Sequence, residues 1–189
     1  MRIRSYLSYS QLVAFENNQY VERYLKGMNF ESKYQRFGKE FHEAMTKETK
    51  DENIEKLKLF LPIYKSREIK ITTEIESIPI LGILDGFNKR KKEFCDYKTG
   101  KKWTQSMADK SDQITFYYIL LWKKYGWIAK KSFIHWIETA EENGEMRFTG
   151  KIRTFETHRT MRDILLLFRR IKRSWQGIEV LCNKELSKI

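Results

Sequence analysis

The 189-residue chain is long enough for one domain with a sizeable core, and 41% of its residues are hydrophobic. It has no apolar run near the roughly 18 residues that a membrane span needs, and its charged N-terminus lacks the apolar centre of a signal peptide, so we expect a cytoplasmic protein. Lysine and arginine outnumber aspartate and glutamate by 37 to 25, which gives a net charge of +12. Besides solubility, this charge favours a polyanion partner, with nucleic acid first and an anionic membrane surface second.

Cysteine usage excludes several classes of protein. Cys95 and Cys182 are the only two cysteines, and neither belongs to a CxxC pair. This argues against a disulfide scaffold, a zinc site and an iron–sulfur cluster. There is no repeat, no low-complexity segment and no Pro/Gly-rich linker, so residues 1–189 are expected to form a single domain.

Three helices are predicted in the N-terminal third of the chain. The first begins near Ser8 or Ser10, each a good N-cap, and ends near Gly27. Residues 34–48 form the second, and residues 52–60 form the third, which stops before Pro62.

The hydrophobic period then changes to that of strands. Residues 69–78 alternate, residues 79–87 are apolar on both faces and therefore buried, and a third strand follows. The remaining predicted elements are strand 92–100, helix 108–125, strands 130–140 and 145–156 joined at Asn143-Gly144, and helix 157–175. The apolar stripe of the last helix is Met161, Ile164, Leu165, Phe168, Ile171 and Trp175. This order of elements predicts an α/β fold with a central mixed sheet flanked by helices.

Two acidic residues are predicted to meet across a hairpin. Asp96 and Lys98 share one face of strand 92–100 because side chains alternate along a strand. A two-residue loop (Arg90-Lys91) or a four-residue loop (residues 89–92) places Asp85 opposite Asp96, with Cβ atoms roughly 5 Å apart. Two buried carboxylates at that separation repel unless they share a proton or bind a cation, which favours a Mg²⁺ or Mn²⁺ site. The alternative is a charged hairpin end in which Lys98 neutralises Asp96.

Two further pairs lie four residues apart on predicted helices and so share a helix face. Gly38 would let its helix approach another element closely, and His42 could supply an imidazole ligand, although a histidine beside Phe41 could also simply pack. Gln113 and Tyr117 could hydrogen-bond a phosphate or orient Lys98, or Tyr117 could belong to the core.

These motifs, taken together, resemble the PD-(D/E)XK nuclease superfamily, in its RecB-like branch. That branch includes the nuclease domain of the RecBCD helicase-nuclease and the CRISPR-associated adaptation nucleases. The matching segments occur in the family's order along most of the chain. They are LSYSQL, FGKEFH with Gly38 and His42, GILDG with Asp85, DYKTG with Asp96 and Lys98, and QITFY with Gln113 and Tyr117.

The resemblance implies a restriction-endonuclease-like core and a role for each matched residue. Asp85, Asp96, His42 and the Tyr97 backbone carbonyl would hold the metal, and Lys98 would position or activate the attacking water. Three groups would support them. These are an acidic side chain from Glu74 or Glu76, the Gln113–Tyr117 pair, and Gly38. Many relatives carry four cysteines that bind an iron–sulfur cluster, but this chain retains only Cys182 in the corresponding regions, so no cluster is expected.

The expected function is that of a Mg²⁺- or Mn²⁺-dependent DNase, an exonuclease of DNA recombination, repair or CRISPR/phage DNA processing. Its partners would be single- or double-stranded DNA and, beyond DNA, a helicase, a recombination or CRISPR adaptation protein, or further copies of itself. The alternatives are a structure-specific endonuclease, a non-cleaving nucleic-acid-binding module and a basic membrane-surface protein. The residues expected to contact DNA are Lys101, Lys102, Trp103, Arg162, Arg169 and Arg173.

Overall fold

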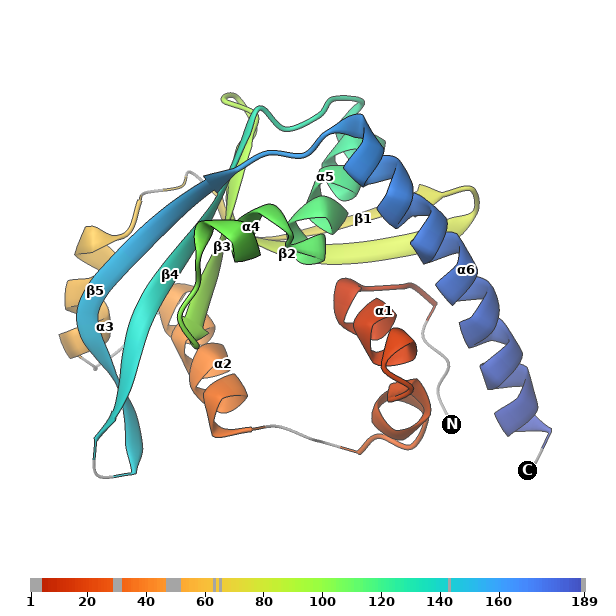
Figure 1. Cartoon of the computed structure of the whole chain (residues 1–189), viewed down its shortest axis with the longest axis horizontal. Helices are drawn as coiled ribbons and strands as arrows, with labels where there is room; N and C mark the ends of the chain where they lie inside the picture. Colours follow the sequence, from red (N-terminus) through yellow and green to blue (C-terminus); the bar gives the residue numbers. More distant parts are fainter. Residues whose placement is uncertain are drawn as a thin grey trace.

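The computed structural model describes residues 5–28, 32–46, 52–62, 64, 66–142 and 144–187. A five-stranded sheet runs through the middle of the molecule in the order β1-β2-β3-β4-β5 (Figure 1). Its strands are β1 (Ser66–Ile75), β2 (Ile78–Asn88), β3 (Glu93–Gly100), β4 (Lys131–Glu142) and β5 (Glu145–Thr157). Strands β3 and β4 are parallel, and the other neighbours are antiparallel. The predicted mixed sheet is therefore confirmed. The predicted Asn143-Gly144 turn lies at the β4–β5 junction, but Asn143 is outside the described residues.

Helices cover both faces of this sheet. They are α1 (Tyr9–Glu16), the π-helix η1 (Val21–Leu25), α2 (Lys33–Thr46), α3 (Glu52–Phe60), α4 (Gln105–Asp109), α5 (Asp112–Tyr125) and α6 (Met161–Leu186). One buried cluster packs α1, α5 and α6 against the sheet through residues such as Phe94 and Phe116. A smaller cluster on the other face contains Phe41 of α2 and Tyr97 of β3. None of the described helices combines the length and apolar sequence that crossing a bilayer requires.

Two predicted helices are each interrupted in the structure. The first stops at Asn17, and Asn18 adopts a left-handed backbone with φ of 57°, which asparagine tolerates better than most residues. The chain then resumes as the π-helix η1, a rare form that often marks functional segments. The predicted helix 108–125 is interrupted at Ser111, which caps α5 by accepting a hydrogen bond from the Ile114 amide.

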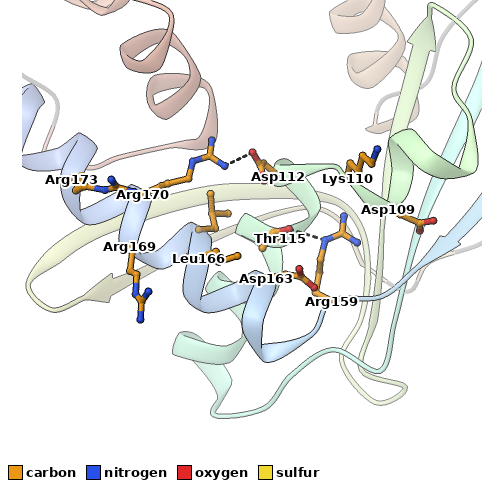
Figure 2. Close-up of a pocket in the computed structure, with 11 residues that line it drawn as sticks. Asp109, Lys110, Asp112, Thr115, Arg159, Asp163, Leu166, Arg169, Arg170 and Arg173 are labelled. Carbon is orange, nitrogen blue, oxygen red and sulfur yellow. Dashed lines mark hydrogen bonds and ion pairs between the residues drawn. The ribbon is translucent and has the colours of Figure 1, made fainter.

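A buried arginine fixes the second interruption. Arg159 is 8% exposed, and its guanidinium donates to the carbonyls of Ala108 and Ser111 at 2.8 Å each. It also donates to the Thr115 hydroxyl at 2.7 Å (Figure 2). A further hydrogen bond of 2.7 Å goes to the Thr157 hydroxyl. The α4–α5 junction is thereby attached to the segment that leads into α6.

The last helix is longer than predicted and turned relative to the predicted stripe. It continues to Leu186, and its buried line is Ile164, Leu167, Ile171, Ile178 and Cys182. Met161 and Leu165, which were predicted to face the core, are 43% and 45% exposed. The buried line continues past Trp175 to Ile178 and Cys182. The helix face that this longer line defines includes Leu167 and excludes Met161 and Leu165.

Strands β2 and β3 stay together only near their hairpin. Within the described lengths of both strands the ladder has three pairs, from Asn88↔Glu93 to Gly86↔Cys95, so the loop is the four-residue one, residues 89–92. Farther along, Leu7 takes the place of β3 at the β2 edge, where its amide donates to the Pro79 carbonyl at 2.8 Å. The two strands therefore diverge from Gly86 onward, and the space between them opens.

The close packing at this branch point can be tested with Gly86→Ala. A Cβ at Gly86 would lie 2.6 Å from both Cys95 Sγ and Tyr64 Cγ, and both of these side chains are buried. We expect a loss of about 1–3 kcal/mol in the free energy of unfolding, measured by urea denaturation. Thr72→Ala, at an exposed position of β1, serves as the control and should change stability far less. An unchanged midpoint for Gly86→Ala would show that the packing at the branch point is looser than described.

Candidate active site

Asp85 lies where the β2–β3 ladder ends. It is 7% exposed, and its Oδ2 accepts a hydrogen bond from the Tyr97 amide at 2.6 Å. This bond replaces the backbone pairing that the diverging strands no longer make. The side chain of Asp85 is thereby fixed between β2 and β3.

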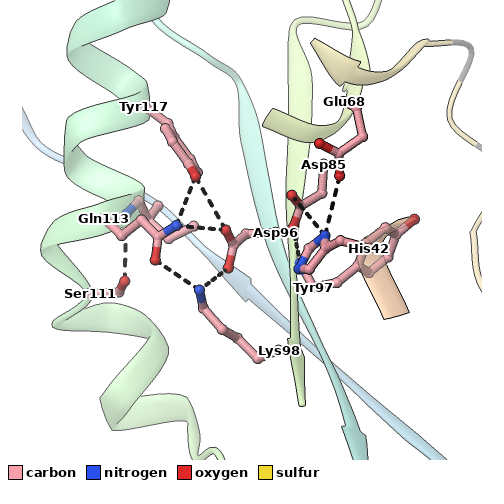
Figure 3. Close-up of polar contacts among 10 residues, drawn as sticks. His42, Glu68, Asp85, Asp96, Tyr97, Lys98, Ser111, Gln113 and Tyr117 are labelled. Carbon is pink, nitrogen blue, oxygen red and sulfur yellow. Dashed lines mark hydrogen bonds and ion pairs between the residues drawn. The ribbon is translucent and has the colours of Figure 1, made fainter. Parts of the chain in front are cut away.

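Asp85 is one of three potential ligand groups that converge here (Figure 3). His42 Nδ1 lies 3.2 Å from Glu68 Oε1 and 3.5 Å from Asp85 Oδ1. One ligand atom from each of the three residues lies within 4.8 Å of the others. Two carboxylates and an imidazole form a donor set that suits a divalent cation.

The backbone explains how these residues meet. Helix α2 approaches β3 so closely that a Cβ on Gly38 would lie 3.3 Å from Thr99 Oγ1, and His42 follows one helical turn later. Glu68 has a left-handed φ of 51° and interrupts the β1–β2 ladder between Arg67↔Gly86 and Ile69↔Leu84. The irregularity turns its side chain toward Asp85.

Lys98 belongs to a second cluster, next to the first (Figure 3). Its Nζ lies 2.7 Å from Asp96 Oδ2 and donates to Gln113 Oε1 at 2.8 Å. Gln113 Nε2 donates to Asp96 Oδ1 at 3.0 Å and to the Tyr117 hydroxyl at 2.7 Å. Each polar end of Gln113 therefore has a partner, and the amide holds the lysine and the carboxylate in one geometry.

The charges of the two clusters influence one another. Burial, followed by the Asp96 charge, raises the pKa of Asp85 from its ordinary 3.8 to about 7. Burial alone would lower the pKa of His42, but the hydrogen bond to Glu68 and the charges of Asp85 and Asp96 outweigh it and raise that pKa. Burial and the Asp96 charge raise the pKa of Tyr117, so its hydroxyl stays protonated. A bound cation would relieve the excess of negative charge around Asp85.

The converging group differs from the predicted ligand set in one member. His42 and Asp85 are in both, whereas Asp96 lies with Lys98 and Gln113, and Glu68 stands in the group instead. The Tyr97 backbone carbonyl stays a predicted ligand.

Neither Glu74 nor Glu76, the two residues expected to add an acidic group, lies near Asp85 in the structure. Glu74 pairs with Pro79 at the far end of β1, and Glu76 lies in the turn beyond it, where it forms an ion pair with Lys172. Six residues of strand separate Glu74 from Glu68, a distance of roughly 20 Å. The β1–β2 hairpin has a two-residue turn at Glu76-Ser77, and this register sets Glu68 across from Asp85. This register could have been counted out along the sequence if the position of the turn were known, but the turn lacks the Asn-Gly pair that would mark it.

Both clusters open onto one groove. A cavity of about 550 Å³ is lined by His42, Tyr97, Lys98 and Gln113, and by Arg23 of η1 from the opposite side. Lys98 and His42 are thus accessible to a substrate from the same side.

The predicted DNA-contacting residues fall into two regions. Trp103 lies near the groove, with its ring centroid 5.9 Å from Lys98 Nζ, and Lys101 and Lys102 are exposed just before it. Arg169 and Arg173 line a different cavity beside Asp112 and Arg159 (Figure 2). Arg162 is exposed at the start of α6.

The fold has counterparts among solved structures, although no protein-family model and no curated protein matches the sequence. A protein of Eubacterium rectale, described provisionally as an exonuclease, superposes with a TM-score of 0.63 at 12% identity, over 98% of this chain and 88% of its own. A phage-related exonuclease of Haemophilus somnus 129PT superposes with a TM-score of 0.56 at 15% identity, over 92% of this chain and 83% of its own. The likeness confirms the α/β fold with a central mixed sheet flanked by helices.

The raised pKa of Asp85 predicts a pH-dependent stability in the metal-free protein. The folded state holds the Asp85 proton more tightly than the unfolded state, so this contribution is complete below about pH 4 and is lost as the pH rises through 7. An asparagine side chain at this position could still accept the Tyr97 hydrogen bond but cannot ionise. Wild type should therefore lose stability relative to Asp85→Asn as the pH rises between these values.

The measurement is urea denaturation of both proteins in EDTA across that range. Comparing the two variants removes the contribution of other groups, such as His135, whose pKa is lowered to about 4 by burial. Parallel stability curves would contradict the raised pKa of Asp85.

Proposed function

We propose that this protein is a Mg²⁺- or Mn²⁺-dependent DNase that hydrolyses phosphodiester bonds as an exonuclease, in the RecB-like branch of the PD-(D/E)XK superfamily. The observation that carries the proposal is the adjacency of two clusters on one groove. One is the ligand group of His42, Glu68 and Asp85, and the other is Lys98 held by Asp96 and Gln113. Metal-dependent phosphodiester hydrolysis needs both kinds of site, charge neutralisation and a positioned cationic donor.

His42, Glu68 and Asp85 would hold the metal, with the Tyr97 carbonyl and Asp96 as the remaining proposed ligands. When bound, a divalent cation neutralises phosphate charge and lowers the pKa of water. Asp85 is the central ligand because its buried carboxylate gains most from a cation.

Lys98 would act on the phosphate directly. Its side chain is 23% exposed and lines the groove, so its ammonium group can donate to a phosphate oxygen and stabilise charge that develops there. Asp96 and Gln113 keep the side chain extended and fixed, so that little reorganisation is needed when substrate binds. Gln113 would act as a positioning residue, and Asp96 would both position Lys98 and serve as a proposed ligand.

The substrate class rests on charge and on the structural relatives. The net charge of +12 suits a polyanion, and the two solved structures described above carry exonuclease descriptions, one of them provisional. Trp103, Lys101 and Lys102 would contact the DNA next to Lys98, and Arg162, Arg169 and Arg173 would contact it elsewhere. We further propose a role in DNA recombination, repair or CRISPR/phage DNA processing, with a helicase, a recombination protein, a CRISPR adaptation protein or further copies of this chain as partner; one of the two structural neighbours is itself described as phage-related.

The direct test incubates end-labelled single- and double-stranded DNA with the protein in Mn²⁺, Mg²⁺ or EDTA. We expect metal-dependent release of short products and, for Lys98→Ala, a rate lower by roughly 10²–10³-fold with DNA binding largely kept. The reason is that Lys98 acts in the reaction, whereas most binding energy comes from other cations. The product ladder gives the direction of digestion.

Lys130→Ala is the matched control, because it removes the same charge at an exposed position before β4. It should cut at the wild-type rate. Turnover by Lys98→Ala equal to that of Lys130→Ala would contradict the role of Lys98, and DNA binding without cutting in any metal would favour the non-cleaving module.

A further inference from the structure

The groove continues past Lys98 into a second part with different chemistry. A cavity of about 550 Å³ adjoins the first, and the two share Ser10, Arg23, Gln35 and Gln113 as lining residues. Arg23 and Gln113 therefore stand at the boundary, with the hydrolytic residues on one side. The far part lies in the space that opens where β2 and β3 diverge.

The walls of this far part are aromatic and aliphatic. Tyr6 and Tyr9 line it from the N-terminal segment and α1, and Leu81 and Ile83 line it from β2. Ile83 is 43% exposed, an unusual exposure for an isoleucine in the middle of a strand. No carboxylate lines the cavity among the described residues, whereas Arg23 does.

The Tyr9 ring packs against the core, and the Arg23 side chain beside it has no carboxylate partner among the described residues. Tyr9 is half-buried, its ring centroid lies 6.2 Å from that of Phe116, and Phe116 is fully buried in the core. Arg23 forms no ion pair with any carboxylate in the described part of the chain and lies on the short π-helix η1. Along the groove, the aromatic and aliphatic walls come first, Arg23 stands at the boundary, and the hydrolytic clusters follow.

We propose that the Tyr9–Ile83 part of the groove binds the base of an unpaired nucleotide, while Arg23 holds the phosphodiester between that base and the cleavage site. Aromatic side chains bind nucleic acid by stacking on the face of a base, and this face is accessible only when the base is unstacked. A pocket of this volume holds a molecule of drug size, which is the scale of a nucleotide. The inference rests on the proposed nuclease function and specifies its substrate as a single-stranded or frayed DNA end.

The test measures DNA affinity without cleavage. Wild type is titrated in EDTA against a labelled single strand, the matching blunt duplex and the same duplex with a single-stranded overhang, by fluorescence anisotropy. We expect the single strand and the overhang to bind more tightly than the blunt duplex. Tyr9→Leu keeps apolar volume but loses the ring, and it should weaken single-strand binding about five- to tenfold with little change for the duplex.

Two further variants keep the test decisive if Tyr9→Leu is unstable. Arg23→Gln should make the dependence of single-strand affinity on salt shallower, by about 0.7 in the log–log slope, because one phosphate contact is lost. Tyr125→Leu is the control, since Tyr125 lies at the other end of α5 from Gln113, roughly 18 Å along the helix. It should bind every DNA as wild type does.

Equal affinity for blunt duplex and single strand, with Tyr9→Leu and Arg23→Gln indistinguishable from wild type, would overturn the proposed subsite. Adding Mn²⁺ to the same DNA tests the nuclease separately. Cleavage without a single-strand preference would leave the nuclease and remove the subsite. A preference that depends on Tyr9 and Arg23 without cleavage would support the subsite and remove the nuclease.

Discussion

The Asp85 carboxylate connects β2 and β3 at the point where the backbone pairing of the two strands ends. Its hydrogen bond from the Tyr97 amide, at 2.6 Å, joins two strands that otherwise diverge. This one side-chain hydrogen bond holds the branch point while leaving the space beyond it open. Because it fixes Tyr97, it also fixes its neighbours Asp96 and Lys98, whose side chains leave β3 toward α5. The groove, the ligand group and the position of the lysine all depend on this contact.

The buried Asp85 carboxylate also lowers the stability of the fold when it is ionised, and this unfavourable charge is what suits the site to a cation. Asp85 is buried beside Asp96, and although Lys98 pairs with Asp96, burial and the Asp96 charge still raise the pKa of Asp85, so that a proton or a bound cation would stabilise it. Glu68 adds a third carboxylate through a strained backbone, with φ of 51°. Local strain and unfavourable charge of this kind persist where the surrounding structure enforces them, and here two hydrophobic clusters enclose the sheet from both faces. A divalent cation bound at this group would neutralise part of the negative charge, and the relief of repulsion would add to the free energy of binding.

Much of the fold could be predicted from sequence because local patterns determine it. Strand alternation, the register of the hairpin around residues 89–92 and the helical spacing of Gln113 and Tyr117 all have a short-range signal, and the structure brings Gln113 to Lys98 as the spacing allows. The sequence allowed a two-residue or a four-residue loop in that register, and the structure has the four-residue one. Glu68 was missed because its position depends on a turn, Glu76-Ser77, whose two positive φ angles have no glycine to signal them. The interruption at Ser111 was missed for a similar reason, since the side chain that fixes it, Arg159, is far away in sequence.

The most direct test of this account is calorimetric titration of Mn²⁺ into Glu68→Gln and Glu74→Gln, beside wild type, at a pH above the Asp85 pKa of about 7. Both variants remove one negative charge from β1, but only Glu68 lies within the ligand group. We expect Glu74→Gln to bind Mn²⁺ as wild type does and Glu68→Gln to bind it at least tenfold more weakly, because a ligand is lost. Equal affinity in the two variants, or a loss confined to Glu74→Gln, would contradict it.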